Sequence, residues 1–246
     1  MEKYFVFLIL ALITEIIGTI SGFGSSILFV PTASLFFDFK AVLGITAVFH
    51  VFSNISKITL FRNGINKDIA IKLGIPAVLF VILGAWLTKY VPVKEMELGM
   101  NILIALLAIF LLFRFNKPIK QTNQNLYLGG MISGFFAGLV GTGGAIRGIT
   151  LAAFNLPKDI FIATSALIDL GVDLSRAVIY VSQGYFPTEY IKLIPFLILV
   201  SVLGSYLGKV ILKFTSEKLF KYIVLGVVLL TSLFQFINYF TVHTTP

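Results

Sequence analysis

Two apolar segments carry the polar side chains that could do chemistry, and both carry them at the same spacing. The stripe in segment 41–61 is Thr46, His50, Asn54 and Lys57, and the stripe in segment 160–181 is Ser165, Asp169, Asp173 and Arg176. Within each stripe the steps are four, four and three residues, so each set lies on one face of a helix. Hydroxyl, amide and cationic groups on such a face could bind a small anion, and neighbouring carboxylates could carry a proton.

The two bases, Lys57 and Arg176, would supply the positive charge of an anion site. A charged side chain near mid-bilayer costs several kcal/mol and usually has a function, and arginine can bind an oxyanion through two N–H groups. Two structural interpretations compete with this one. Lys57 lies near the end of its segment and could extend to the membrane surface, and Arg176 could simply neutralise Asp173 three residues before it.

The acidic pair and the histidine have similar alternatives. Asp169 and Asp173 are one helical turn apart, so the two carboxylates could share a proton and couple its movement to transport. A packed structural network would use the same residues. His50 could bind substrate, or it could be a neutral, hydrogen-bonded histidine of the interior.

Two glycine-rich stretches interrupt long apolar segments and lie 119 residues apart, at Gly22 and Gly141. The residues proposed to bind substrate there are Gly22, Gly24, Ser25 and Ser26 in the first stretch, and Thr142, Gly143 and Gly144 in the second. In lipid, a broken helix is tolerated only where it is buried in protein or lines a cavity, and breaks at matching places in two halves indicate a transporter's binding site. Close helix packing is the simpler alternative.

The breaks also provide helix ends. Short helices that begin at Ser25 and Gly144 would present free N–H groups and a partial positive charge to an anion. Glu15 and Arg147 lie close to the two breaks in the sequence. Arg147 could contact substrate, pair with an acid or face the outer water.

The composition identifies the broad class. Hydrophobic residues make up 58% of the 246 residues and charged residues only 12%, which is typical of an integral membrane protein. The net charge of +8 indicates basic cytoplasmic loops and not a nucleic-acid partner. With no cysteine and two histidines, a metal site is not expected, and no cofactor is. We find no nucleophile–base pair or nucleotide motif, so we do not expect an enzyme.

The order of segments predicts an all-α polytopic membrane protein built from two internal repeats, 1–120 and 121–246. Each repeat would hold four full spans and one short half-helix after the break. The expected segments are 4–20, 27–37 (short), 41–61, 69–87 and 98–113, then 126–140, 145–156 (short), 160–181, 190–207 and 222–240. Pro76 and Pro195 are expected inside spans, and 209–221 is expected to be a basic loop.

The basic residues favour inverted repeats over parallel ones. If each short segment crosses the membrane, eleven bases face the cytoplasm and six face outward, whereas parallel repeats would give eight and nine. The inverted arrangement places the linker 114–125 inside and both termini outside.

The motifs at the breaks resemble those of the TauE/SafE family of membrane proteins, often called sulfite exporters. They are Ile20-Ser21-Gly22-Phe23-Gly24, then Phe29-Val30-Pro31, the run GFFAGLVGTGG at 134–144, and Ala163-Thr164-Ser165-Ala166. Ser25 and Ser26 replace a richer glycine run, Thr150 stands where a second proline would match Pro31, and Arg147 replaces an apolar residue. The resemblance implies transport of small sulfur-containing or organic anions, such as sulfite, sulfonates or sulfoacetate, without a prosthetic group.

Together these features predict a secondary transporter of the cell membrane, in contact with lipid and a small anionic substrate, that works by alternating access. The main alternative is an ion channel, or a cation or proton carrier, in which Asp169, Asp173 and Glu15 are the ligands.

Overall fold

The computed structural model describes residues 2–62, 64–114 and 120–216, together with the single positions 219, 222, 226, 230 and 233. In these residues the chain forms nine α-helices and one 3-10 helix, with no strand. In chain order they are α1 (Glu2–Ser21), α2 (Ser26–Ala33), α3 (Phe39–Leu60), α4 (Lys67–Leu87), α5 (Val93–Arg114), α6 (Asn123–Val140), α7 (Gly144–Ala152), α8 (Lys158–Ser182), η1 (Thr188–Leu193) and α9 (Ile194–Lys213).

Local polar residues set where several helices begin. Asp38, Asn66 and Thr122 precede α3, α4 and α6, and each side chain accepts a hydrogen bond at 3.1–3.2 Å from the backbone N–H three residues later. Such caps satisfy N–H groups that have no partner inside the helix.

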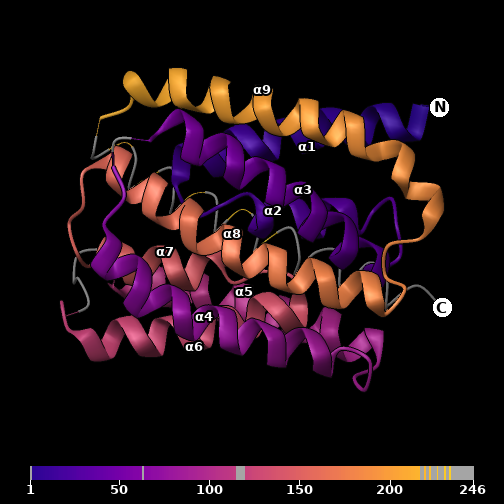
Figure 1. The fold of residues 1–246 in the computed structure, drawn as a ribbon, viewed down its shortest axis with the longest axis horizontal. Helices are drawn as coiled ribbons and strands as arrows, with labels where there is room; N and C mark the ends of the chain where they lie inside the picture. Colours follow the sequence, from indigo (N-terminus) through magenta and orange to yellow (C-terminus); the bar gives the residue numbers. More distant parts are fainter. Residues whose placement is uncertain are drawn as a thin grey trace.

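The long helices are arranged in layers (Figure 1). α1 and α9 lie along one edge of the molecule and α4 and α6 along the opposite edge, with α3 and α8 between them. The short helices α2 and α7 contact each other in the interior, and most of their residues are buried.

The two central helices run in opposite directions. His50 of α3 contacts Arg176 of α8, whereas Asn54, one turn further along α3, contacts Asp173, about one turn earlier in α8. α3 and α8 are therefore antiparallel, and both polar stripes face the same central region.

The α4–α6 edge is packed through a stripe of glycines on α6. Gly130, Gly134 and Gly138 recur every four residues, and a Cβ on any of them would overlap a backbone carbonyl of α4. The overlapped carbonyls belong, in the same order, to Leu73, Ala77 and Val81. Because the partners advance together, α4 and α6 are parallel, and their backbones are as close as small residues allow.

α1 and α9, at the opposite edge, are also parallel, but the glycines of α9 lie against side chains of α1. Gly204 of α9 lies against the side chain of Glu15, and Gly208, one turn later, lies against Thr19. This edge therefore buries a carboxylate, whereas the glycines of α6 lie against backbone carbonyl groups of α4.

The two helix breaks meet in the centre. Gly24 and Gly141 have φ of +80°, a left-handed conformation that side chains strongly disfavour, which explains glycine at these turns. The Ser26 and Thr142 hydroxyl oxygens are 3.5 Å apart. A Cβ on Gly144 would overlap the Phe23 carbonyl oxygen. The breaks are thus in direct contact.

The helix bounds confirm the order of the predicted segments within the described residues but correct several details. The half-helices α2 and α7 are shorter than predicted, at 8 and 9 residues. α9 continues to Lys213, so the first part of 209–221 is helix and not loop; Lys209 is held there by the Leu60 carbonyl oxygen and by the Phe61 ring, 5.2 Å from its Nζ.

Pro195 lies inside the candidate membrane span Thr188–Lys213, as expected, but not in the interior of a regular α-helix. It lies in the first turn of α9, directly after the 3-10 helix η1, where a missing N–H removes no helical hydrogen bond. Pro76, in contrast, is interior to α4 as expected. The predicted last span, 222–240, lies outside the described residues apart from single positions.

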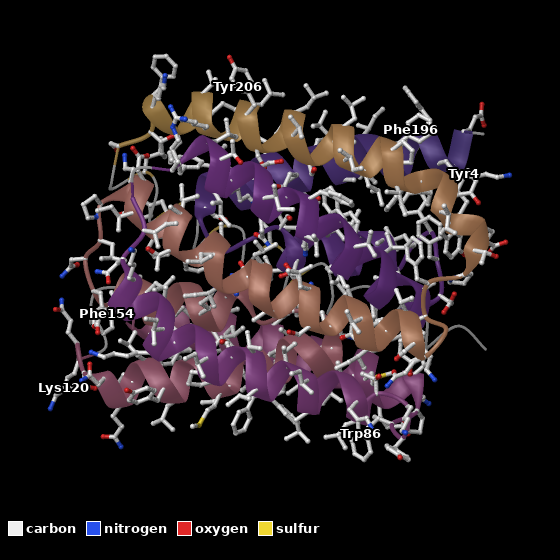
Figure 2. The ribbon with its side chains drawn as sticks, viewed as in Figure 1. Tyr4, Trp86, Lys120, Phe154, Phe196 and Tyr206 are labelled. Carbon is white, nitrogen blue, oxygen red and sulfur yellow. The ribbon has the colours of Figure 1, made fainter. Side chains whose placement is uncertain are left out.

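Four helices in the described part of the chain are long and apolar enough to cross a membrane: Glu2–Ser21, Phe39–Leu60, Lys67–Leu87 and Thr188–Lys213. α8 is longer than most of them, at 25 residues, but has Asp169, Asp173 and Arg176 in its middle. Large hydrophobic side chains such as Trp86, Phe196 and Tyr206 point outward from the helices at the edges (Figure 2) and are about half exposed. These surfaces suit a lipid environment.

Candidate functional site

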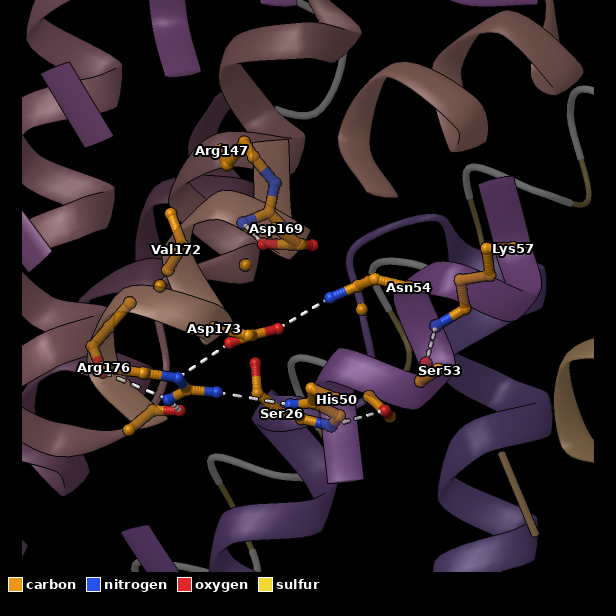
Figure 3. A pocket seen from close by; sticks show the side chains of 16 residues that line it. Ser26, His50, Ser53, Asn54, Lys57, Arg147, Asp169, Val172, Asp173 and Arg176 are labelled. Atoms are coloured by element: carbon orange, nitrogen blue, oxygen red, sulfur yellow. Dashed lines mark hydrogen bonds and ion pairs between the residues drawn. The ribbon is translucent and has the colours of Figure 1, made fainter. Parts of the chain in front are cut away.

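A small cavity lies where the two helix breaks and the two polar stripes come together (Figure 3). Residues 24–26 of the first break and Gly141, Gly143 and Gly144 of the second line it, together with side chains of α3 and α8. Its volume is about 20 Å³, enough for about one or two water molecules. An oxyanion would therefore need side chains to move before it could enter.

Lys57 forms the first of three buried ion pairs, with Glu15 of α1 at 2.8 Å. The same carboxylate accepts hydrogen bonds from the hydroxyl groups of Ser25 and Ser53, both at 2.6 Å, and of Ser205 at 3.0 Å. Glu15 is fully buried, and its partners come from α3, α9 and the residue that precedes α2. A carboxylate with this many donors is well stabilised as an anion, and it ties four parts of the bundle together.

Arg176 forms the second ion pair, with Asp173 one turn earlier on α8, at 2.7 Å from Nε to Oδ1. Its Nη1 donates to the carbonyl oxygens of Gly141 at 2.8 Å and Ala137 at 3.2 Å. These carbonyls belong to the end of α6, where the helix leaves acceptors without partners and the dipole is negative. Arg176 therefore closes the second break.

Asp173 also joins the two stripes. Its Oδ2 accepts a hydrogen bond from Asn54 Nδ2 at 2.7 Å, so two residues that match in the sequence stripes are in direct contact. Asp173 thus has two strong donors, Arg176 and Asn54.

Arg147 forms the third pair, with Asp169, a contact between Nη1 and Oδ1. Its Nε donates to Ser165 at 3.0 Å, and its Nη2 makes a long contact of 3.5 Å with the Phe23 carbonyl oxygen in the first break. Asp169 is 13% exposed, more than either of the other two carboxylates.

His50 connects the networks. Arg176 Nη2 lies 3.3 Å from Nδ1, and the Ser25 hydroxyl lies 2.8 Å from Nε2. Because arginine can only donate, Nδ1 must accept and Nε2 carries the hydrogen, which describes a neutral imidazole. Ser25 in turn donates to Glu15, so a continuous chain of donors leads from Arg176 to Glu15.

The sequence matches the family described as "Sulfite exporter TauE/SafE" over residues 7–234. The chain belongs to the sulfite exporter TauE/SafE family. No curated protein and no solved structure matches it. TauE/SafE proteins are membrane exporters of sulfite and related anions and not enzymes, so membership implies an integral membrane protein with a small anionic substrate.

Most of the residues predicted for the site of this TauE/SafE protein lie around the cavity. Those that line it are Gly24, Ser25, Ser26, His50, Asn54, Lys57, Gly143, Gly144, Asp169, Asp173 and Arg176. Gly22 and Ser165 line a smaller neighbouring cavity that shares Gly24, Asn54, Lys57 and Asp169 with the first.

Two predicted residues do not line either cavity. Thr142 contacts Ser26, and Thr46 is completely buried, with no hydrogen-bond partner for its hydroxyl among the described residues. The alternative in which Lys57 extends to the membrane surface is wrong, because Lys57 is 5% exposed and its charge meets Glu15 inside the bundle. The alternative in which Arg176 neutralises Asp173 is confirmed as a contact.

Sequence reasoning missed three parts of this TauE/SafE site. The pairing of Lys57 with Glu15 was not predicted, and Ser53 and Ser205 were not singled out. Ser53 donates to Glu15 and accepts from Lys57 at 2.8 Å, and its position four residues before Lys57 is a signal that could have found it. Ser205 comes from the opposite half of the chain, and no local pattern points to it.

The charges of the site balance. Three bases face three carboxylates in the buried pairs Lys57–Glu15, Arg147–Asp169 and Arg176–Asp173. Among the described residues no group of three or more histidine, cysteine, aspartate or glutamate side chains could hold a metal ion. The three pairs and their hydrogen-bond donors give the site paired charges and hydrogen-bonding groups.

Proposed function

We propose that this TauE/SafE protein is a secondary transporter that moves small sulfur-containing or organic anions, such as sulfite, sulfonates or sulfoacetate, across the cell membrane by alternating access. The observation that carries the proposal is the cavity between the two helix breaks, where three buried bases surround a space of about 20 Å³. Anions that leave water need such fixed donors in place of their hydration.

The half-helices support an anion as the ligand. α2 and α7 both begin at this cavity, and the first residues of a helix have free N–H groups and a partial positive charge. Ser25 and Ser26 add hydroxyl groups, and Lys57 and Arg176 add full charges from the two stripes. Because these groups come from both halves of the chain, movement of one half against the other would change access to the site.

The proposal includes two inverted repeats, 1–120 and 121–246. Adding 119 to the bounds of α1, α2 and α3 gives 121–140, 145–152 and 158–179, close to the bounds of α6, α7 and α8. The contacts correspond as well: α1 packs on α9 as α6 packs on α4, and α3 packs on α9 as α8 packs on α4. The corresponding helices α3 and α8 are antiparallel, which favours inversion over a parallel duplication.

A cation or proton carrier, or a channel, is the competing function, with Glu15, Asp169 and Asp173 as ligands. Each of these carboxylates is already paired with a buried base, so the paired side chains carry no net charge. The N-termini of α2 and α7 at the cavity add partial positive charge, which favours an anion over a cation.

A thermal-shift screen of the purified protein with small anions tests the function. An anion at one hundred times its Kd should stabilise the fold by about 2.7 kcal/mol. Sodium chloride and potassium chloride serve as controls. Uptake into liposomes then distinguishes the two functions, because an anion carrier takes up anions and the competing carrier or channel takes up cations. Stabilisation and uptake of cations, with no response to sulfite, sulfonates or sulfoacetate, would show that the anion assignment is wrong.

A further inference from the structure

The three buried ion pairs differ in how many other groups hold the carboxylate. Glu15 accepts from Lys57 and from serine hydroxyls of three segments, and Asp173 accepts from Arg176 and Asn54. For Asp169, Arg147 is the one hydrogen-bond or ion-pair partner in direct contact found among the described residues. An ionised carboxylate can accept about four hydrogen bonds, so Asp169 is the carboxylate whose charge is least satisfied.

The base of this pair is in an unusual place. Arg147 lies in the first turn of α7, with its backbone N–H bonded to the Gly143 carbonyl oxygen at 3.2 Å. A cation is unfavourable there, because the N-terminus of a helix already has a partial positive charge. Its Nη2 lies 3.2 Å from the position that a Cβ on Gly144 would take, so the guanidinium group folds over this helix end.

Arg147 and the N-terminus of α7 therefore face the same small space as Asp169, the carboxylate that pairs with Arg147. Lys57 and Arg176 are different, because their N–H groups are engaged with groups that also hold the fold, namely Ser53 for Lys57 and the α6 carbonyl groups for Arg176. Arg147 donates from Nε to Ser165 at 3.0 Å, but its contact with backbone is a single long one of 3.5 Å.

We propose that Asp169 occupies the place of the substrate anion on Arg147, and that protonation of Asp169 transfers Arg147 and the N-terminus of α7 to the anion. The inference rests on the proposed anion-carrier function and deepens it by naming the base and the coupled proton. A proton from water on the open side binds a carboxylate oxygen of Asp169, the ion pair separates, and the anion accepts the N–H groups that Asp169 released.

The balance of charges requires this exchange. With three bases and three carboxylates, an added monoanion would leave the buried site one charge negative unless a proton enters with it. The charged and titratable groups that surround Asp169 are Arg147 of α7, Lys57 and His50 of α3, and Asp173 and Arg176 of α8. Of the carboxylates, Asp169 is also the most exposed, so a proton reaches it with the least rearrangement.

The test measures proton uptake during anion binding to the purified full-length protein. Ethanesulfonate and sulfoacetate are suitable probes, because neither titrates in mildly acidic to mildly alkaline buffers. Calorimetry in buffers of different ionisation enthalpy should show about one proton taken up for each ethanesulfonate bound, and affinity should fall about tenfold for each pH unit once Asp169 is ionised.

Two variants locate the proton. Asp169→Asn should bind the anion without proton uptake and with an affinity that does not change with pH, whereas Asp169→Glu should keep the proton uptake. Asp159→Asn is the matched control, since Asp159 is exposed at the start of the same helix and its variant should behave as the wild-type protein does.

The outcomes are distinguishable. Anion binding by the wild-type protein without proton uptake, or undiminished uptake in Asp169→Asn, would overturn the inference and leave the anion carrier intact. Binding of neither probe by the wild-type protein or by Asp169→Asn would count against the carrier itself, and the inference would fall with it.

Discussion

Two of the buried ion pairs, Lys57–Glu15 and Arg147–Asp169, differ in how firmly the rest of the molecule holds them. In the first half, Lys57 meets a carboxylate, Glu15, that serine side chains from three other places also hold. In the second half, Arg147 meets Asp169, for which no further donor is found in the described part of the chain. The first carboxylate is thus hydrogen-bonded to several parts of the bundle, whereas the second is held by its base alone among the described residues.

This difference teaches that burial alone does not identify the functional charge. Both bases are at most 6% exposed, and both line the same cavity. What separates them is the number of other bonds that would be lost if the pair opened. A well-bonded pair strengthens the fold, because breaking it leaves an uncompensated charge, whereas a sparsely bonded pair can open at lower cost.

The largest expected effect tests the Lys57–Glu15 pair. Glu15→Gln keeps the size of the side chain but leaves Lys57 as a buried, unpaired charge, so we expect a loss of about 3–5 kcal/mol of stability. The measurement is thermal unfolding of the purified protein. Glu2→Gln, an exposed change on the same helix, should have no effect. A Glu15→Gln protein as stable as the wild type would show that this pair does not anchor the bundle.

The next effect tests the Arg147–Asp169 pair. Arg147→Gln should weaken anion binding by roughly a hundredfold, since hydrogen bonds to charged groups are worth about 1.5–3 kcal/mol each. Stability should change less than in Glu15→Gln, because Asp169 can take up a proton once its partner is gone. Binding is measured by titration calorimetry, with the exposed Arg62→Gln as the control. Wild-type affinity in Arg147→Gln would remove Arg147 from the site.

A conservative change at Arg176, the base that closes the second break, should have a smaller effect. Arg176→Lys retains the charge but cannot reach Asp173 and the carbonyl groups of Gly141 and Ala137 together, so anion affinity should fall about tenfold. Arg176→Gln, which also removes the charge, should nearly abolish binding. If Arg176→Gln and Lys57→Gln, separately and together, remain folded and bind with wild-type affinity, the charges of the two stripes play no part in binding.

The smallest effect concerns topology and should leave function unchanged. The chain has no native cysteine, so Asn123→Cys and Ser216→Cys, both at exposed positions, can each be labelled specifically. Inverted repeats predict that a membrane-impermeant reagent reaches neither site until the cells are permeabilised. Ready labelling of Ser216→Cys in intact cells, with Asn123→Cys protected, would indicate parallel repeats.

The sequence was most informative where a pattern was local. The glycine clusters located both breaks, and the four-residue spacing placed most of the stripes at the cavity. It was least informative where partners are distant. Glu15 and Lys57 are 42 residues apart, and their pairing depends on how α1 crosses α3, which no periodicity encodes. The local pattern can also include a residue that is not part of the site. Thr46 shares the face of its stripe but does not line the cavity.

The glycine stripe of α6 has a mechanical consequence. Carbonyl groups of α4 lie directly against successive glycines of α6, one helical turn apart. If one helix slid along the other, these carbonyl groups would overlap the larger residues between the glycines until a full turn of about 5–6 Å was completed. Small, continuous shear is therefore blocked at this edge. We therefore expect α4 and α6 to move together as a rigid body during transport. The change in helix positions would then occur at the central α3–α8 contact, which is held partly by side-chain hydrogen bonds that can exchange partners.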